Sequence, residues 1–332
     1  MNKGFFVDER LEQLTQWVKT VSGQPEFDIR PASGDASFRR YFRVTYPDNN
    51  TQIAMDSPPE KEKNPEFVKI AELFQQAGLH VPKILDRDMD RGFLLLSDLG
   101  NRQYLPELTE LTVERLYGDA MGALASFQVC IHEADIPAYD HALLADEMHL
   151  FRDWYLKKEK GLELAEQQAV TLADGFEQLA QMALAQPSVC VHRDYHSRNL
   201  MICDLQTPGI LDFQDAVQGP VTYDLVSLLK DCYISWPQKN ILDWVKGYHE
   251  LAIQSGIIVK ETELETFIEW FEWMGVQRHL KAIGIFSRLK HRDEKPGYMN
   301  DIPRTMVYVL DVCSRYDALQ PFHALLIELG CE

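Results

Sequence analysis

The sequence lacks a long apolar run. No stretch approaches the roughly 18 consecutive apolar residues of a membrane-spanning helix. The opening residues, MNKGFFVDERLEQL, hold neither the apolar segment nor the cleavage site of a secretory signal. We therefore expect a soluble, cytoplasmic protein. Internal repeats and low-complexity segments are missing too, which argues against a repeat architecture.

Closely spaced cysteine pairs are also missing. The six cysteines are scattered along the chain, and none of them forms a C-x-x-C motif. Cys190 and Cys203 fall within apolar runs. We expect both to be buried free thiols in a reducing compartment, rather than members of a disulfide framework.

Positive charge is scarce. The chain has 33 Lys and Arg against 51 Asp and Glu, which gives a net charge of -18. Proteins that bind nucleic acids or anionic membranes depend on basic residues to neutralise phosphate charge. We therefore expect neither partner, and no feature indicates an obligate protein partner. ATP is not excluded, because magnesium and local basic residues can neutralise its phosphates.

The 332 residues suit one two-lobed enzyme or two domains, and 45% of them are hydrophobic, enough for a sizeable core. In the first hundred residues, helices are expected at 8–23 and 66–77. Alternating segments there predict strands at 38–44, 51–55, 81–85 and 92–97. From Thr112 onward the pattern is mainly helical, which predicts an α+β fold. The helices expected in this part span residues 112–131, 142–158, 171–185, 237–254, 261–290 and 303–329.

The stretch VCVHRDYHSRNLMICDLQTPGILDFQDA, residues 189–216, carries the chemistry. Its three short apolar runs predict buried strands, each followed by polar side chains. Asp194 follows the first run, Asn199 comes five residues later, and Asp212 follows the third run. Phosphoryl transfer from ATP needs such a set. One carboxylate accepts the proton of the attacking hydroxyl, while an amide and a second carboxylate hold magnesium on the phosphates.

His192-Arg193-Asp194 with Asn199 matches the H-x-D-x-x-x-x-N catalytic loop of protein-kinase-like enzymes. Asp212-Phe213-Gln214 stands where protein kinases carry D-F-G. The missing Gly, together with HRDYHSRNLM and ILDFQDA, resembles the aminoglycoside phosphotransferase family, which phosphorylates hydroxyls of small molecules. The resemblance extends from about Pro31 to about Arg288.

The resemblance implies an α+β, protein-kinase-like, two-lobed fold. Its β-rich nucleotide-binding lobe would span residues 1–99, and its helical catalytic and acceptor-binding lobe residues 100–332. Within the family, SGDASFRRYFRV (33–44) and DFQDAVQGPVTYDLVSLLKDCY (212–233) resemble the amino-sugar kinases of peptidoglycan recycling. These enzymes phosphorylate the anomeric hydroxyl of N-acetylmuramate and N-acetylglucosamine to give 1-phosphates.

The same resemblance implies ATP and Mg²⁺ as cofactors and a small amino sugar as the acceptor. Asp194 would be the catalytic base and contact the acceptor, while Asn199 and Asp212 would hold the metal. Asp224 would support the catalytic loop by hydrogen bonding its backbone. A carboxylate stabilised by its position at a helix N-terminus is an equally good local account of Asp224.

Residues 33–37 predict a polar loop between strands, with Ser37 among the residues that would approach ATP phosphates. Kinase-like folds carry a phosphate-pairing Lys on the next strand, but here that strand reads QIAMD (52–56) and has none. Arg39 and Arg40 are the nearest cations. They project to opposite strand faces, so only one is expected to reach the phosphates. In the alternative, both lie on the surface.

Two further groups of binding residues follow from the resemblance. Ser97, Asp98 and Leu99 would form the hinge whose backbone pairs with adenine, although a plain turn explains them as well. Arg278 and Lys281, three residues apart on a helix, would contact the carboxylate of N-acetylmuramate. The alternative for this region is aromatic residues in the core and a solvated basic face.

Two other functions stay open at this point. One is a kinase of another small hydroxyl compound, such as an aminoglycoside, choline or homoserine. The other is a regulator that binds nucleotide without catalysis. The missing strand Lys favours the regulator, and the presence of Asp194, Asn199 and Asp212 together argues against it.

Overall fold

The computed structural model describes residues 8–33, 38–131 and 136–332. The chain divides into two compact units. The N-terminal unit comprises Met1–Asn101 and Met201–Gln214, and the helical unit comprises Arg102–Leu200 and Asp215–Glu332. The N-terminal unit is therefore discontinuous in sequence. The predicted lobe boundary between residues 99 and 100 stays a prediction.

The N-terminal unit begins with α1 (Glu9–Ser22), which confirms the first predicted helix. The Asp8 carboxylate caps it by accepting a hydrogen bond from the Leu11 N–H at 3.1 Å, and Gly23 ends it with a left-handed φ of 66°. The buried face of α1 packs on one face of a sheet. This core contains Leu14, Trp17, Val18, Phe42, Val44, Tyr46, Ala54, Phe93 and Leu95.

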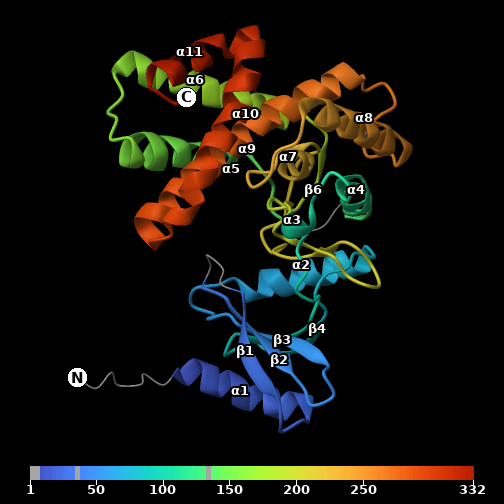
Figure 1. The fold of residues 1–332 in the computed structure, drawn as a ribbon. Helices are drawn as coiled ribbons and strands as arrows, with labels where there is room; N and C mark the ends of the chain where they lie inside the picture. The colour runs from blue at the N-terminus through green and yellow to red at the C-terminus, as the bar shows by residue number, and fades with distance from the viewer. Residues whose placement is uncertain (1–7, 34–37, 132–135) are drawn as a thin grey trace, which may run out of the picture. The chain divides into compact units, whose positions relative to one another are not determined.

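The sheet has five antiparallel strands in the order β1-β2-β3-β5-β4. They are β1 (Asp28–Ser33), β2 (Arg40–Thr45), β3 (Thr51–Asp56), β4 (Ile84–Asp88) and β5 (Phe93–Ser97). Figure 1 shows α1 on one side of this sheet and α2 (Asn64–Gln76) on the other. β2 starts two residues later than predicted, and Phe38 lies before it with 62% of its surface exposed.

A short hairpin completes the N-terminal unit. β7 (Leu200–Met201) pairs with β8 (Gly209–Ile210). Phe213 follows β8, and its ring centroid lies 5.1 Å from Phe67 and 5.7 Å from Phe74, both on α2. These aromatic contacts hold the segment that carries Asp212 against α2.

The helical unit is arranged around α9 (Leu264–Asp293), which packs against α5, η1, α6, α7 and α10. Its other elements are α3 (Tyr104–Glu107), α4 (Val113–Cys130), α5 (His141–Leu150), η1 (Phe151–Glu159), α6 (Glu166–Leu184), β6 (Ser188–Val191), β9 (Val217–Pro220), α7 (Tyr223–Leu229), α8 (Gln238–Gln254), η2 (Pro296–Asp301), α10 (Ile302–Arg315), η3 (Asp317–Leu319) and α11 (Gln320–Glu328). α9 is buried over most of its circumference, including several charged positions.

Three predicted helices differ from the observed ones. The helix expected at 142–158 is α5 followed directly by the π-helical η1. The helix expected at 171–185 starts at Glu166. The last, expected at 303–329, is interrupted after Arg315, and α11 starts afresh with Pro321 in its first turn, where a missing N–H costs nothing.

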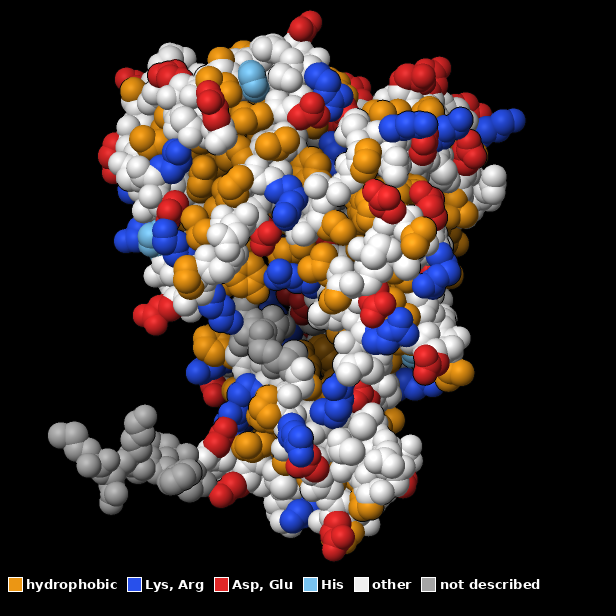
Figure 2. Space-filling model, in the orientation of Figure 1, with side chains coloured by type: hydrophobic (Ala, Val, Ile, Leu, Met, Phe, Trp, Pro, Cys, Tyr) orange, Lys and Arg blue, Asp and Glu red, His pale blue; other side chains and the backbone are white. Residues whose placement is uncertain are grey.

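Figure 2 shows Lys and Arg side chains interspersed with Asp and Glu on one face of the molecule. Several charged side chains of the protein form ion pairs, such as Arg152 with Asp153 and Lys290 with Glu159. Among the described residues, no helix combines the length and the apolarity needed to cross a membrane. Cys190 is buried as predicted, whereas Cys203 is only half-buried; both are free thiols.

Candidate active site

β6 leads into the loop that the sequence predicts to be catalytic. It pairs antiparallel with β9, from Ser188 opposite Pro220 to Val191 opposite Val217, and Val189, Cys190 and Val191 are buried. The chain then turns into residues 192–199, with Arg193 in the left-handed region at a φ of 76°. A non-glycine residue in this region is strained, so the loop needs outside support.

Asp224 provides that support from the first turn of α7. Its carboxylate accepts hydrogen bonds from the backbone N–H groups of His192 at 2.6 Å and Arg193 at 3.0 Å. Burial raises the pKa of Asp224 to about 7, although these two donors favour the ionised form. The predicted supporting hydrogen bonds are confirmed. The alternative account, a carboxylate stabilised by its position at a helix N-terminus, also fits, because Asp224 lies in the first turn of α7.

The Asp194 carboxylate belongs to a pocket of about 90 Å³. The main-chain carbonyl of Asp194 accepts hydrogen bonds from the His196 N–H and the Asn199 Nδ2, both at 3.0 Å. Burial alone would raise the pKa of Asp194, but the charges of Lys281, Arg193 and Arg278 outweigh it and hold the pKa below its ordinary value. Asp194 is therefore a carboxylate at neutral pH, as a proton acceptor must be.

The pocket combines charged and aromatic walls, and all of its lining residues belong to the helical unit. The Tyr233 and Phe286 rings in its wall have centroids 6.1 Å apart. The complete lining consists of Arg193, Asp194, His196, Tyr223, Cys232, Tyr233, Arg278, Lys281, Ala282, Ile285 and Phe286.

Arg278 and Lys281 both line this pocket and are only 5% and 7% exposed. The alternative of a solvated basic face is therefore wrong for these two residues. Lys281 Nζ lies 2.9 Å from a Glu147 oxygen and donates to the Tyr223 hydroxyl at 2.9 Å. His279, between them, is also buried, but its Nε2 lies 2.8 Å from the Lys230 carbonyl oxygen. Burial lowers the pKa of His279 to about 3, so the ring is neutral.

Glu147 on α5 links these cations, and sequence reasoning missed it. Its carboxylate is 5% exposed and makes ion pairs with Arg193 and Lys281. It also accepts hydrogen bonds from the Tyr139 hydroxyl and from Gln277. Burial would raise the pKa of Glu147, yet Lys281 and Arg193 hold it below its ordinary value. Nothing in the local sequence of α5 marks this residue.

The predicted metal ligands lie on different units. Asn199 belongs to the helical unit. Its Nδ2 donates a hydrogen bond to the Asp194 carbonyl, so the other end of the amide group is its oxygen. Asp212 belongs to the N-terminal unit, has a φ of 63° and accepts a hydrogen bond from Gln214 Nε2 at 2.8 Å. Both offer the hard oxygen atoms that magnesium prefers. No group of three or more His, Cys, Asp and Glu forms a metal site in the described part of the chain.

Arg39 and Arg40 project from β2 and its start in opposite directions, as predicted. Arg39 is 7% exposed, forms an ion pair with Glu62 at 3.0 Å and places its guanidinium 5.8 Å from the Phe67 ring centroid. The alternative of two surface arginines is therefore wrong for Arg39. Arg40 pairs with Asp8 and Asp56, which ties the start of α1 to β3. Ser37 lies outside the described residues.

The predicted hinge residues follow β5. The Ser97 N–H donates to the Lys83 carbonyl at 2.9 Å, and Asp98 forms an ion pair with Arg43 at 2.6 Å. The Leu99 carbonyl accepts a weak hydrogen bond from Cys203 Sγ at 3.5 Å. The Ser97 donor is thus engaged within the N-terminal unit. The adenine contacts stay a prediction.

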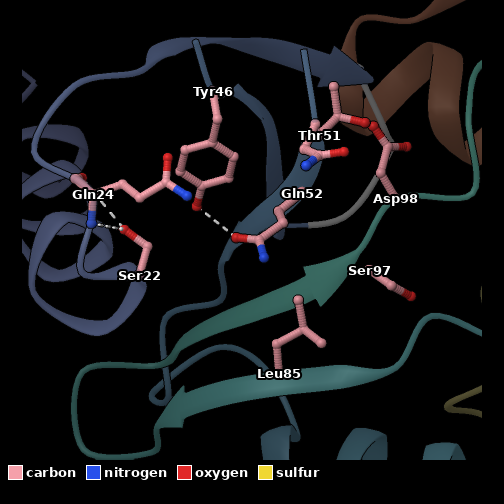
Figure 3. Close-up of a pocket in the computed structure, with 9 residues that line it drawn as sticks. Ser22, Gln24, Tyr46, Thr51, Gln52, Leu85, Ser97 and Asp98 are labelled. Atoms are coloured by element: carbon pink, nitrogen blue, oxygen red, sulfur yellow. Dashed lines mark hydrogen bonds between the residues drawn. The ribbon is translucent and has the colours of Figure 1, made fainter. Parts of the chain in front are cut away.

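Beside this turn lies a polar pocket of about 370 Å³. Figure 3 shows Ser97 and Asp98 at its edge, with the Tyr46 hydroxyl donating to Gln52 at 2.5 Å. Leu85 contributes an apolar side chain to the lining, which is otherwise mostly hydroxyls and amides.

Comparisons with known proteins identify the family of this chain. The family model described as the phosphotransferase enzyme family matches residues 28–254. The chain belongs to this family. It is 43% identical to an N-acetylmuramate/N-acetylglucosamine kinase of Neisseria meningitidis serogroup B, over 97% of this chain and 96% of that protein. A protein of the same name from Pseudomonas putida is 44% identical over 97% of each chain.

Solved structures show the same fold at low identity. The ADP-bound aminoglycoside phosphotransferase APH(2'')-Ib is 14% identical with a TM-score of 0.59, and the match covers 92% of this chain and 99% of that one. Choline kinase from Cryptosporidium parvum Iowa II is 11% identical with a TM-score of 0.64, over 97% of each chain. The predicted α+β, protein-kinase-like fold and the resemblance to aminoglycoside phosphotransferases are confirmed.

Proposed function

We propose that this protein is a magnesium-dependent kinase that transfers the γ-phosphoryl group of ATP to the anomeric hydroxyl of N-acetylmuramate and N-acetylglucosamine. The products are the sugar 1-phosphates, and we assign the reaction to the cytoplasmic recycling of peptidoglycan sugars. The observation that carries the proposal is the ionised Asp194 in a pocket with Arg278 and Lys281. Relatives matched over 96% or more of their length and named for these two sugars support the choice of acceptor.

Asp194 is the group we assign to the acceptor hydroxyl. An ionised carboxylate orients the hydroxyl by accepting its hydrogen bond, and takes its proton as the bond to phosphorus forms. Glu147 forms ion pairs with Arg193 and Lys281, which both line this pocket, and Asp224 holds the loop backbone. These residues keep Asp194 in place and ionised.

The nucleotide contacts are assigned to the N-terminal unit. The aminoglycoside phosphotransferase of similar fold was solved with ADP bound, which supports an adenine nucleotide as cosubstrate. We assign the phosphates to Arg39, whose ion pair with Glu62 replaces the Lys–Glu pair of protein kinases. Ser37, Ser97, Asp98 and Leu99 remain proposed contacts. Asn199 and Asp212 would hold magnesium, which when bound neutralises charge on the phosphates.

The pocket argues against a cationic acceptor. Arg193, Arg278 and Lys281 all line it, and like charges would repel an aminoglycoside or choline. A regulator without catalysis would have no need to keep a carboxylate ionised in such surroundings. Both alternatives therefore have less support than an amino-sugar kinase.

The deciding experiment incubates the protein with ATP, magnesium and each sugar, and identifies the product by phosphorus NMR. We expect a signal coupled to the anomeric proton for both sugars, and none with the Asp194→Asn variant. Phosphate on another hydroxyl, or turnover only with a cationic alcohol, would overturn the acceptor assignment and leave the kinase assignment standing.

A further inference from the structure

Arg278 is a buried cation that forms no ion pair with a carboxylate of the described residues. It lies in the middle of α9 and is 5% exposed. Within the described residues, no carboxylate lies at ion-pair distance from it, and its Nε has no hydrogen-bond partner. Its Nη1 approaches only the weak acceptor Cys232 Sγ, at 3.7 Å. A buried charge in this state is costly unless an anion pairs with it, and a bound ligand can supply that anion.

The other two cations of the pocket are already paired. Lys281 Nζ contacts Glu147 and the Tyr223 hydroxyl, and Arg193 also forms an ion pair with Glu147. Asp231 lies near Arg278, but its carboxylate accepts hydrogen bonds from the Ser197 side chain and from the Ser197 and Tyr233 N–H groups. Within the described chain, Arg278 is therefore the lining cation that forms no ion pair, although the nearby charges of Asp231 and Asp194 favour its charged form.

The chemistry of Arg278 selects an oxyanion. A guanidinium is planar, keeps its charge when buried and can donate two parallel hydrogen bonds to a carboxylate. Every lining residue of this pocket belongs to the helical unit that carries Asp194. This placement favours an anionic group of the acceptor, rather than of the nucleotide, as the partner of Arg278. The Tyr233 and Phe286 rings add apolar area to the same lining.

Resting on the proposed function, we infer that Arg278 is the specificity residue for an acidic amino sugar, and that it pairs with the lactyl carboxylate of N-acetylmuramate. Lys281 has a different role: it belongs to the Glu147 network that positions the catalytic loop. N-acetylglucosamine has no carboxylate, so it enters the same pocket without this ion pair. Arg278 and Lys281 therefore have different roles, although their spacing of three residues on α9 predicts that they act together.

The test compares three acceptors: N-acetylmuramate, its uncharged carboxamide and N-acetylglucosamine. In Arg278→Gln, the ratio of kcat/KM for N-acetylmuramate to that for N-acetylglucosamine should fall at least about 10-fold, because one partner of a buried charge pair is lost. The loss should lie mainly in KM. With wild-type protein, the carboxamide should be poorer than the acid by a similar factor.

Lys281→Met is the matched control. It should lower kcat for both sugars and leave their ratio within about threefold of wild type, because it disturbs a positioning network and not the carboxylate contact. Equal losses on both sugars in Arg278→Gln would mean that Arg278 meets the transferred phosphoryl group or the shared ring, and would overturn the inference.

Two further outcomes separate the inference from the proposed function. If Arg278→Gln does not fold, the wild-type carboxamide comparison decides, since equal use of acid and carboxamide contradicts a role for the carboxylate. If wild-type protein phosphorylates neither sugar, the proposed function fails. In that case, acetate or D-lactate binding that disappears in Arg278→Gln would still support an anion site at Arg278, and no such binding would reject it.

Discussion

Asp194 is half-buried and keeps its charge because the cations Lys281, Arg193 and Arg278 lie near it. Asp194→Asn preserves the size of the side chain but removes the proton acceptor. We expect turnover to fall by roughly 100-fold or more, the scale of general-base contributions. Binding of an ATP analogue, measured by calorimetry, should stay close to wild type. Turnover like that of wild type would exclude Asp194 as the base.

The two proposed metal ligands predict different responses to magnesium. Asp212→Ala removes an anionic oxygen, so turnover should collapse and excess magnesium should restore little of it. Asn199→Ala removes a neutral oxygen, so we expect a weaker defect that higher magnesium partly corrects. Magnesium titrations of kcat/KM measure both effects. If both variants titrate like wild type, the metal site lies elsewhere.

Arg39 and Arg40 offer a matched pair on adjacent positions. Arg39→Ala should raise the Michaelis constant for ATP more than that for the sugar, because the cation proposed to meet the phosphates is lost. Arg40→Ala breaks the pairs with Asp8 and Asp56, so it should lower the melting temperature more than it alters ATP kinetics. The reverse pattern would assign the phosphates to Arg40.

The residues that sequence could identify are those whose role depends on spacing within one loop. Asp194 and Asn199 are five residues apart, and a hydrogen bond within the loop joins them. Glu147 could not be identified this way. It lies 46 residues before Arg193 in an ordinary helix, and only the packing of α5 against α9 brings it to Lys281. Long-range packing of this kind leaves no local pattern.

At the scale of elements, α7 positions the catalytic loop through Asp224. Asp224→Asn would present one oxygen and one amide N–H₂ to two backbone donors, leaving a buried N–H unsatisfied at a cost of about 1–3 kcal/mol. We expect kcat to fall and the melting temperature to drop by a few degrees, with the Michaelis constants little changed. Kinetics and thermal unfolding measure these effects. A variant with wild-type kcat would show that the loop holds its conformation without Asp224.

Helices with one buried face could be predicted from the sequence, whereas a change from α-helical to π-helical structure could not. α1, α4 and α8 match the expected ranges closely, because their apolar positions recur at three and four residues. The π-helical η1 was not predicted. Its buried residues Phe151 and Leu156 are five residues apart, which fits the π-helical repeat, but one such pair is too short a pattern to indicate a helical period. η1 packs against α9, a long-range contact that leaves no pattern in the local sequence.

At the scale of the whole molecule, Lys230 imposes a pH-dependent cost on stability. It is 1% exposed, its Nζ has no hydrogen-bond partner among the described residues, and burial lowers its pKa to about 8, with Glu272 opposing the shift. The unfolded chain holds the proton up to an ordinary pKa near 10.5. The folded protein therefore gains stability from this group as pH rises from about 8 to 10.5, and bears the full cost below 8.

Lys230→Met tests this cost. At pH 7 the variant should be more stable than wild type, by at most about 3 kcal/mol, since each pKa unit corresponds to roughly 1.4 kcal/mol. The difference in melting temperature should shrink between pH 8 and pH 10. A difference that stays constant across this range would mean that Lys230 is not neutralised in the folded protein.

The discontinuity of the N-terminal unit has a consequence for the order of events during synthesis. The segment Met201–Gln214, with Phe213 packed on α2, leaves the ribosome only after about 100 residues of the helical unit. At roughly 5 to 20 residues per second, this delay lasts about 5 to 20 s. Until then the newborn sheet and α2 expose the apolar surface that Phe213 will cover. The nascent chain therefore passes through a stage in which a chaperone can bind the surface later occupied by the segment that carries Asp212.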